Sequence, residues 1–352
     1  MTTPTRRGAA FGALLAFLSL FLGCSSSRAS AETSRTDFVL GTLCTVRIVE
    51  GPKGAKAEKL LDGAFARLRA IEERLSANKE GTELARINEA AGRAALPASD
   101  ELRLVLGKAL EYARLSGGAF DPSIGPLVKL WGIGSDAARL PARSEIEAAR
   151  RLIDWRAVEL DEAAKTVRLA RPGMRLDLGA IAKGYAADEL KRLLAAGGVK
   201  AAIVDLGGNV YALGAKRGGG NWRIGVQVPD PQAGRGEYLG IVEGLDMTVV
   251  TSGVYERFLE AGGKRYHHIL DPATGYPVEN GLVSVTIATG SSIDADALST
   301  TLFTMGRERG MALAAKLPGL SVVMVDAAGK VYLSPGASKV FTLTSAAYTL
   351  AD

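Results

Sequence analysis

Two short segments in the last third of the chain hold a high density of polar, chemically active side chains. HHILDPATGYPV, residues 267–278, contains both histidines of the chain, and DADALSTTLFTMG, residues 294–306, contains Asp296 and Thr300. If Asp294 caps a helix, Asp296 and Thr300 stand at i and i+4 and project from one face. A carboxylate and a hydroxyl are hard oxygen ligands, which suit Mg²⁺. Ordinary capping, in which acidic residues meet the helix dipole, accounts for the same residues without a metal.

A second polar segment, RLDLGAIAKGYAADEL, covers residues 175–190. It predicts a strand that ends near Asp177 and a helix that opens near Ala180, with Lys183 in its first turn. Free amides at a helix N-terminus, together with one lysine, favour a phosphate group. A solvated Lys183 is the simpler alternative. The GxxxxGK[ST] and GxGxxG nucleotide-binding patterns are both absent.

His267 and His268 are neighbours before a predicted turn, a place where substrates are often bound. On a strand only one of the two can face a site, and either one could instead be a structural, partly buried histidine. The chain has no GxSxG and no HExxH pattern, which excludes the common serine hydrolases and zinc proteases. Besides Cys24 the chain has one cysteine, Cys44, which lies in an apolar strand pattern and is expected in the core.

Helices and strands alternate without a regular βαβ period, and no linker of low complexity divides them. We therefore expect one α+β domain with mixed or antiparallel sheets flanked by helices. The expected strands cover 37–50, 157–179 (two strands around a turn), 201–214, 222–230, 238–253 and 283–289, with a hairpin over 321–334. The expected helices cover 57–76, 101–118, 144–153, 180–198, 294–306 and 310–317. A loop with a short helix is expected over 77–98, and an irregular connection over 120–134.

The N-terminus is typical of an export signal, with Arg6 and Arg7 before an apolar run over 9–22. The string LFLGC resembles a bacterial lipobox, so residues 1–23 are expected to be cleaved and Cys24 to be lipidated. An uncleaved anchor or a plain signal peptide is the alternative. Residues 24–36 are then a flexible spacer, residues 37–352 the domain, and the protein faces the periplasm from a bacterial membrane. The net charge of +5 is small and evenly spread, which argues against nucleic acid as a partner.

In their order along the chain, seven motifs resemble the ApbE family of FAD:protein FMN transferases. They are LGT (40–42), SGGAFDPSIGPLVKLWGIG (116–134), DLGAIAKGYAAD (177–188), VDLGGN (204–209), TSGVYERF (251–258), HHILDPATGYPV and DADALSTTLFTMG. The resemblance implies a T-fold-like domain that binds FAD as substrate, uses Mg²⁺, and transfers FMN to a threonine or serine hydroxyl of a target protein, releasing AMP. The implied partner is an exported or membrane redox protein with an (S/T)GA(S/T) segment.

The same resemblance assigns roles to single residues. It implies metal binding by the backbone carbonyl of Ala180 and the side chains of Asp296 and Thr300, with Ser299 close by. The implied flavin-nucleotide contacts are Leu40, Ala119, Phe120, Asp121, Asp177, Lys183 and Leu270. Asn78 stands where the family often has a tyrosine that covers the cofactor, so an aromatic stack would be lost.

For the proton acceptor of the reaction, His268 is the first candidate and Asp296 the second. Three other functions stay open. The first is a Mg²⁺-dependent FAD pyrophosphatase that gives free FMN and AMP, for which Asn78 is the motivating feature. The second is a lipoprotein that stores FAD without catalysis, and the third is a structural lipoprotein that binds no flavin.

Overall fold

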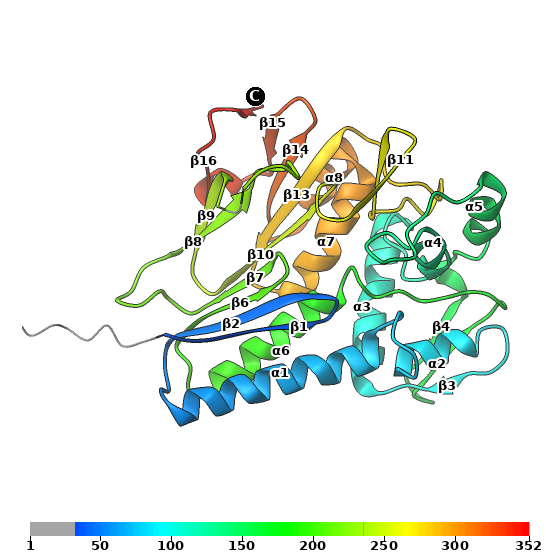
Figure 1. Cartoon of the computed structure of the whole chain (residues 1–352), viewed down its shortest axis with the longest axis horizontal. Coiled ribbons are helices and arrows are strands. Elements are labelled where there is room, and N and C mark those ends of the chain that lie inside the picture. The colour runs from blue at the N-terminus through cyan, green and yellow to red at the C-terminus, as the bar shows by residue number, and fades with distance from the viewer. Residues whose placement is uncertain (1–31, 235, 352) are drawn as a thin grey trace, which may run out of the picture. The chain divides into compact units, whose positions relative to one another are not determined.

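A nine-stranded sheet is the centre of the fold in the computed structural model, which describes residues 32–234 and 236–351 (Figure 1). All neighbouring strands are antiparallel except the last pair, which is parallel. In spatial order the strands are β1 (Thr33–Val39), β2 (Thr42–Glu50), β6 (Ala201–Leu206), β7 (Asn209–Leu213), β10 (Met247–Gly253), β13 (Leu282–Thr289), β14 (Ser321–Asp326), β15 (Lys330–Leu333) and β17 (Thr349–Leu350).

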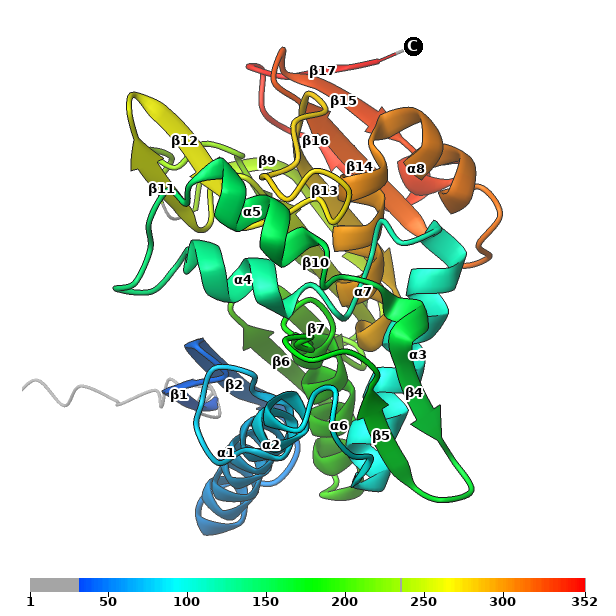
Figure 2. The ribbon, with the colours of Figure 1, turned by 90° about the vertical axis from the view of Figure 1, so that its right-hand side faces the viewer.

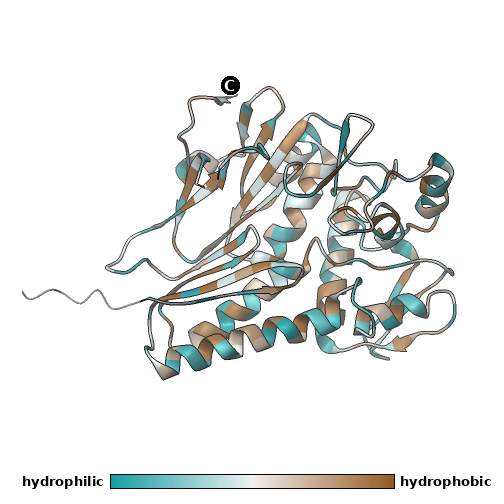
Figure 3. Cartoon of the chain, in the orientation of Figure 1, coloured by the Kyte–Doolittle hydropathy of each residue, from teal (hydrophilic) through white to brown (hydrophobic). Residues whose placement is uncertain are grey.

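Helices cover one face of this sheet and bury the main hydrophobic core against it. They are α1 (Ala55–Leu75), α6 (Ala182–Ala196), α7 (Ser292–Met305) and α8 (Arg307–Ala314). Leu61, Phe65 and Leu68 of α1 are fully buried because their spacing places them on one side of the helix. Apolar and polar bands accordingly alternate along α1 in Figure 3.

A smaller sheet covers part of the opposite face. Its order is β16 (Phe341–Leu343), β9 (Tyr238–Gly244) and β8 (Trp222–Gln227). Val242 and Phe341 of this sheet pack against Val249 of β10 and Val323 of β14 in a second core. The covered part of the large sheet is therefore its C-terminal half.

The remaining elements surround one end of the large sheet (Figure 2). They are α2 (Glu83–Glu89), α3 (Asp100–Ser116), α4 (Gly125–Trp131), α5 (Arg143–Arg150), the small sheet of β3 (Leu96–Pro97), β5 (Thr166–Leu169) and β4 (Val158–Asp161), and the hairpin of β11 (Phe258–Ala261) and β12 (Lys264–His267). Trp131 packs with Leu127, Ile146 and Leu270 in a third, local core and donates its indole N–H to the carbonyl of Gly275 at 2.9 Å.

The α+β prediction is confirmed, and the structure corrects it at two places. Residues 37–50 are not one strand, because Leu40 and Gly41 have φ angles of 57° and 68° and reverse the chain between β1 and β2. The segment 120–134 is not wholly irregular, because α4 occupies its centre. Pro126 stands in the first turn of α4, where a missing N–H costs nothing.

The first strand begins earlier than the expected domain boundary. Strand β1 starts at Thr33, before the expected domain boundary at residue 37, so residues 33–36 are not a flexible spacer. The expected signal segment 1–23 and Cys24 lie outside the described residues. Within the described ranges, no helix is both long and apolar enough to cross a membrane.

Candidate active site

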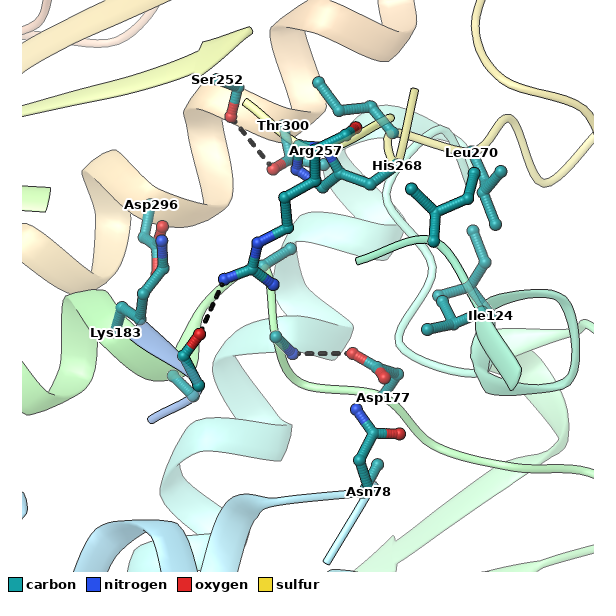
Figure 4. Close-up of a pocket in the computed structure, with 18 of the residues that line it drawn as sticks. Asn78, Ile124, Asp177, Lys183, Ser252, Arg257, His268, Leu270, Asp296 and Thr300 are labelled. Carbon is teal, nitrogen blue, oxygen red and sulfur yellow. Dashed lines mark hydrogen bonds between the residues drawn. The ribbon is translucent and has the colours of Figure 1, made fainter. Parts of the chain in front are cut away.

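A cavity of about 650 Å³ opens where the β1–β2 turn, the end of α1, the N-terminus of α6, α7 and the loop after β12 meet. Figure 4 shows its two chemically different sides: Lys183 and Asp296 lie on one, and Leu270 and Ile124 on the other. The cavity brings together most of the residues singled out from the sequence, which are Leu40, Asn78, Ala119, Phe120, Asp121, Asp177, Ala180, Lys183, His268, Leu270, Asp296 and Thr300. Ser299 is not in the lining, but its hydroxyl lies 2.8 Å from that of the lining residue Ser252.

Two carboxylates fasten the N-termini of α6 and α7 to each other. Asp296 of α7 accepts a hydrogen bond at 2.8 Å from the backbone N–H of Gly184 in the first turn of α6. Asp188 of α6 accepts from the N–H groups of Ser292 and Ile293 at 3.0 and 2.9 Å. Each helix therefore supplies an anion to the positive end of the other. The expectation of free α6 amides for a phosphate is wrong at Gly184, because Asp296 already occupies that amide.

Asp296 and Thr300 do face the same cavity, as their helical spacing predicts. The Thr300 hydroxyl lies 3.5 Å from the hydroxyl of Ser252. Ser299 is turned into the protein, where its hydroxyl donates to the carbonyl of Asp296 at 2.9 Å and lies 2.8 Å from Ser252. Burial raises the pKa of Asp296, and the nearby Lys183 charge opposes that rise.

Asp294 is not the helix cap that the sequence predicts, since α7 starts at Ser292 after Ser291. Its carboxylate instead accepts from the Tyr112 hydroxyl at 2.6 Å and pairs with Lys108 at 3.1 Å. Both partners come from α3. Asp294 therefore anchors α7 to α3, away from the cavity.

The donors at the polar side fit a hard cation only in part. Among residues 32–234 and 236–351, no three His, Cys, Asp or Glu side chains gather as a metal cluster would. Asp296 supplies one carboxylate, Thr300 one hydroxyl, and Ala180 lies on the same cavity wall. Mg²⁺ commonly binds through one or two carboxylates, several waters and the phosphates of a substrate. These residues therefore fit Mg²⁺ when a phosphate-bearing substrate completes the ligand set.

Of the two histidines, His268 lines the cavity and His267 is buried behind it. The His267 Nε2 lies 2.9 Å from the carbonyl of Val278, which makes it a structural residue. Burial, aided by the Arg257 charge, lowers the pKa of His268 to about 3, so the ring is neutral at pH 7. Its Nδ1 lies 3.3 Å from the Arg257 carbonyl. A proton on Nδ1 leaves Nε2 as the acceptor.

Asp121 and Asp177, the other two predicted aspartates, differ in how many hydrogen bonds their carboxylates already accept within the protein. The carboxylate of Asp121 accepts from the N–H and hydroxyl of Ser123, at 2.8 and 2.6 Å, and from the N–H of Trp155 at 3.2 Å. Asp121 therefore shapes the loop that carries Phe120. Asp177 accepts one bond, from the N–H of Gly179 at 2.8 Å, and lies beside Asn78 in Figure 4. Burial raises the pKa of both carboxyls.

Four further charged residues line the cavity and were not predicted as site residues: Glu72, Lys79, Glu256 and Arg257. Glu72 accepts from the N–H of Leu40 at 2.7 Å, and Arg257 donates to the carbonyl of Gly41 at 3.2 Å, so both hold the β1–β2 turn. Glu256 lines the cavity, and burial raises the pKa of its carboxyl. Glu256 and Arg257 belong to TSGVYERF, but nothing in that motif shows which side chains face inward. Glu72 resembles any other charge on a long helix.

Cys44 is confirmed as a core residue. It is fully buried, and its thiol lies 3.3 Å from the carbonyl of Val39. Burial raises the pKa of this thiol to about 12, which suppresses the reactive thiolate.

A cavity with an apolar, aromatic side and a polar side with Lys183, Arg257 and Asp296 suits a ligand that is part ring system and part phosphate. The ApbE family model matches residues 40–324, and the chain belongs to this family. The matched range includes every cavity residue named above.

Named relatives cover nearly the whole chain. A FAD:protein FMN transferase of Treponema pallidum is 40% identical over 92% of this chain and 93% of its own length. One from Klebsiella pneumoniae is 37% identical over 84% of this chain and 91% of its own. Among solved structures, the flavin transferase ApbE of Vibrio cholerae superposes with a TM-score of 0.78 at 29% identity, covering 88% of this chain and 99% of that one. The ApbE protein of Thermotoga maritima gives 0.77 at 31% identity, covering 86% and 96%.

Proposed function

We propose that this chain is a FAD:protein FMN transferase that uses Mg²⁺ and modifies a threonine or serine hydroxyl of a redox protein. The observation that carries the proposal is a cavity with Asp296, Thr300 and Lys183 on one side and apolar residues on the other. The named relatives support the same activity. The apolar side suits the flavin ring system, and the polar side suits the pyrophosphate.

In the reaction, the hydroxyl oxygen of the acceptor attacks the phosphorus of the FMN half of FAD. The bond from that phosphorus to the bridging oxygen breaks, and AMP leaves with the electron pair. The hydroxyl proton passes to Nε2 of the neutral His268. The negative pyrophosphate, once bound, raises the pKa of His268 from about 3 towards its usual range, which strengthens the base.

Residues that are already held in position stabilise the negative charge that develops on the departing AMP. Lys183 lies in the first turn of α6, and Asp296 is held by the Gly184 amide. Mg²⁺ bound by Asp296, Thr300 and the Ala180 carbonyl would neutralise pyrophosphate charge. Asp296 is better suited to this role than to that of a base, because its ionised carboxylate is needed as a ligand.

The test is mass spectrometry of a peptide with an (S/T)GA(S/T) segment after incubation with FAD and Mg²⁺. A mass gain equal to one FMN is expected, and Asp296→Asn should lower its rate by about 100-fold or more. Asp294→Asn is the matched control, since it removes a carboxylate of the same helix that faces α3. Chelation of the metal should abolish transfer by the unaltered protein. Equal rates in the two variants would contradict the assigned metal site.

Hydrolysis of FAD to free FMN and AMP is the second candidate function. Asn78 favours it, because this exposed residue lines the cavity where an aromatic side chain would shield the nucleotide from water. The same incubation separates the two functions. Free FMN and AMP without a peptide adduct indicate a pyrophosphatase, and unchanged FAD that stays bound indicates a storage protein.

The location of the protein follows from its N-terminal sequence in this proposal. Residues 1–23 are removed on export, Cys24 carries the lipid, and the domain faces the periplasm. The acceptor is then an exported or membrane redox protein on the same side of the membrane. With both proteins on one side of the membrane, the enzyme can reach its acceptor directly.

A further inference from the structure

Three hydroxyl groups are joined in a row that leads from the cavity wall into the protein. The hydroxyl of Thr300, which lines the cavity, lies 3.5 Å from the hydroxyl of Ser252, and a dashed line joins the two in Figure 4. The Ser252 hydroxyl lies 2.8 Å from that of Ser299. Ser299 is fully buried and donates to the backbone carbonyl of Asp296 at 2.9 Å. We call Thr300, Ser252 and Ser299 the hydroxyl network.

The carbonyl at the inner end of the hydroxyl network determines the direction of its hydrogen bonds. A carbonyl oxygen can only accept, so the one hydrogen of the Ser299 hydroxyl is used at Asp296. Ser299 must then accept from Ser252, and this bond uses the one hydrogen of Ser252. Ser252 can therefore only accept from Thr300. As a result, the hydroxyl hydrogen of Thr300 points towards Ser252.

This direction leaves the lone pairs of the Thr300 oxygen free for a ligand in the cavity. A hydroxyl binds Mg²⁺ through a lone pair of its oxygen, and a hydrogen aimed at the cation would oppose binding. A cation on the Thr300 oxygen would also make its O–H a stronger donor, which strengthens the long contact with Ser252. Ser252 and a cation would thus bind to Thr300 cooperatively.

Strand β10 holds Ser252 against α7. Thr248 and Ser252 are four residues apart on β10 and lie on the same face of the strand. The Thr248 hydroxyl lies 3.0 Å from that of Ser292 in the first turn of α7, so hydroxyls join β10 to α7 at two places. Of these two strand residues, Ser252 lines the cavity and Thr248 is fully buried. Thr248 therefore offers a comparison that separates holding the helix from directing Thr300.

We propose that Ser252 is a positioning residue, which accepts the hydroxyl hydrogen of Thr300 and so directs the lone pairs of Thr300 at the cation that accompanies the pyrophosphate. This inference rests on the proposed transferase function. Ser299, which the family resemblance groups with the metal ligands, acts behind Ser252 by fixing the direction of its hydroxyl. The serine of the TSGVYERF motif thereby gains a role that its sequence does not show.

The test measures the affinity of the full-length protein for Mg²⁺ by isothermal titration calorimetry in the presence of AMP. AMP carries the phosphate of the leaving group and cannot react further. We expect Ser252→Ala to raise the Kd for Mg²⁺ about tenfold, since hydrogen bonds to metal ligands typically contribute roughly 10- to 100-fold to affinity. Ser252→Thr, which keeps a hydroxyl, should retain the affinity of the unaltered protein.

Thr248→Val is the matched control, because it removes the other hydroxyl contact between β10 and α7 and keeps the shape of the side chain. Its Kd for Mg²⁺ should equal that of the unaltered protein. A second comparison starts from Thr300→Val, which removes the ligand itself. In that background Ser252→Ala should cause no further loss of affinity, because the two residues act through one hydrogen bond.

An unchanged Kd in Ser252→Ala overturns the inference. An equal loss in Thr248→Val overturns it as well, because Ser252 would then only hold the helix against the strand. The same holds for a further loss when Ser252→Ala is added to Thr300→Val. No binding of Mg²⁺ to the unaltered protein would contradict the metal site and the inference together. A failure of the transferase function is distinct, because the unaltered protein then binds Mg²⁺ but forms no FMN adduct.

Discussion

His267 and His268 are adjacent in sequence and opposite in role, which makes them a matched pair for testing the proton acceptor. His268→Asn should lower the rate of FMN transfer by about 100-fold or more, because asparagine cannot take up the hydroxyl proton. Binding of FAD should persist. His267→Asn should instead destabilise the fold by about 1 kcal/mol, since the ring loses its partner at Val278, while the folded protein keeps its rate. Single-turnover formation of the FMN adduct and urea unfolding separate these effects, and similar rate losses in both variants would exclude the assignment.

The lowered pKa of His268 also predicts how stability depends on pH. In the folded protein the ring stays neutral down to about pH 3, whereas in the unfolded chain it takes up a proton near pH 6.5. Between these values the unfolded state binds more protons, so the stability that His268 contributes is complete above pH 6.5 and is lost as the pH falls.

Buried carboxyls such as Asp296 and Glu256 have raised pKa values and act in the opposite direction. The measurement is therefore the difference in free energy of unfolding between the unaltered protein and His268→Asn, taken from pH 7 to pH 4. As the pH falls, the unaltered protein should lose free energy of unfolding relative to His268→Asn. A difference that is independent of pH would show that His268 titrates normally in the folded state.

For single residues, the sequence predicts a role where the spacing along a helix or strand determines which way a side chain points. The i, i+4 spacing of Asp296 and Thr300 places both on one helix face, and alternation on a strand separates His267 from His268. Partners distant in sequence cannot be obtained in this way. The carboxylate of Asp121 accepts hydrogen bonds from the N–H groups of Ser123 in its own loop and of Trp155. These hydrogen bonds can be identified only in the folded chain.

At the scale of elements, the site depends on how closely α6 and α7 approach, and Gly184 sets that distance. A Cβ at Gly184 would lie 2.2 Å from the Ser292 carbonyl oxygen and 2.7 Å from the Cβ of Asp296. Gly184→Ala should therefore destabilise the protein by about 2 kcal/mol and lower transfer activity, because it displaces Asp296. Gly63→Ala in α1, where a Cβ meets nothing within 4 Å, should be neutral or stabilising by up to about 1 kcal/mol. Urea unfolding of both variants checks this, and a neutral Gly184→Ala would contradict the close packing.

Element types were predictable where one local pattern dominates. The repeat of Leu61, Phe65 and Leu68 predicts α1, and the turn residues around β14 and β15 predict their hairpin. The β1–β2 reversal could not be predicted, because Leu40 adopts a left-handed conformation that its own side chain disfavours. Glu72 and Arg257 enforce it from distant parts of the chain.

At the scale of the whole domain, the sheet joins segments from both ends of the chain. Strand β2 pairs with β6, and β7 pairs with β10, so residues 42–50 and residues 247–253 belong to one sheet. The cavity likewise combines the turn at Leu40 with Thr300 of α7. Local patterns predicted the α+β class but not this assembly. The ordered resemblance of seven motifs to one family is what linked the distant segments.

Lipidation at Cys24, as proposed, would hold the domain at a membrane. Cys24 precedes Thr33, the first residue of β1, by nine residues, and nine residues span at most about 30 Å when fully extended. If Cys24 carries the lipid, Cys24→Ser should move the protein from the membrane fraction to the soluble fraction of the cell envelope. Transfer to a soluble acceptor by the purified variant should be unchanged, because the cavity lies within residues 40–300. Transfer to a membrane-embedded acceptor in cells should fall, since the two proteins lose their shared surface. An unchanged distribution between the fractions would contradict lipidation at Cys24.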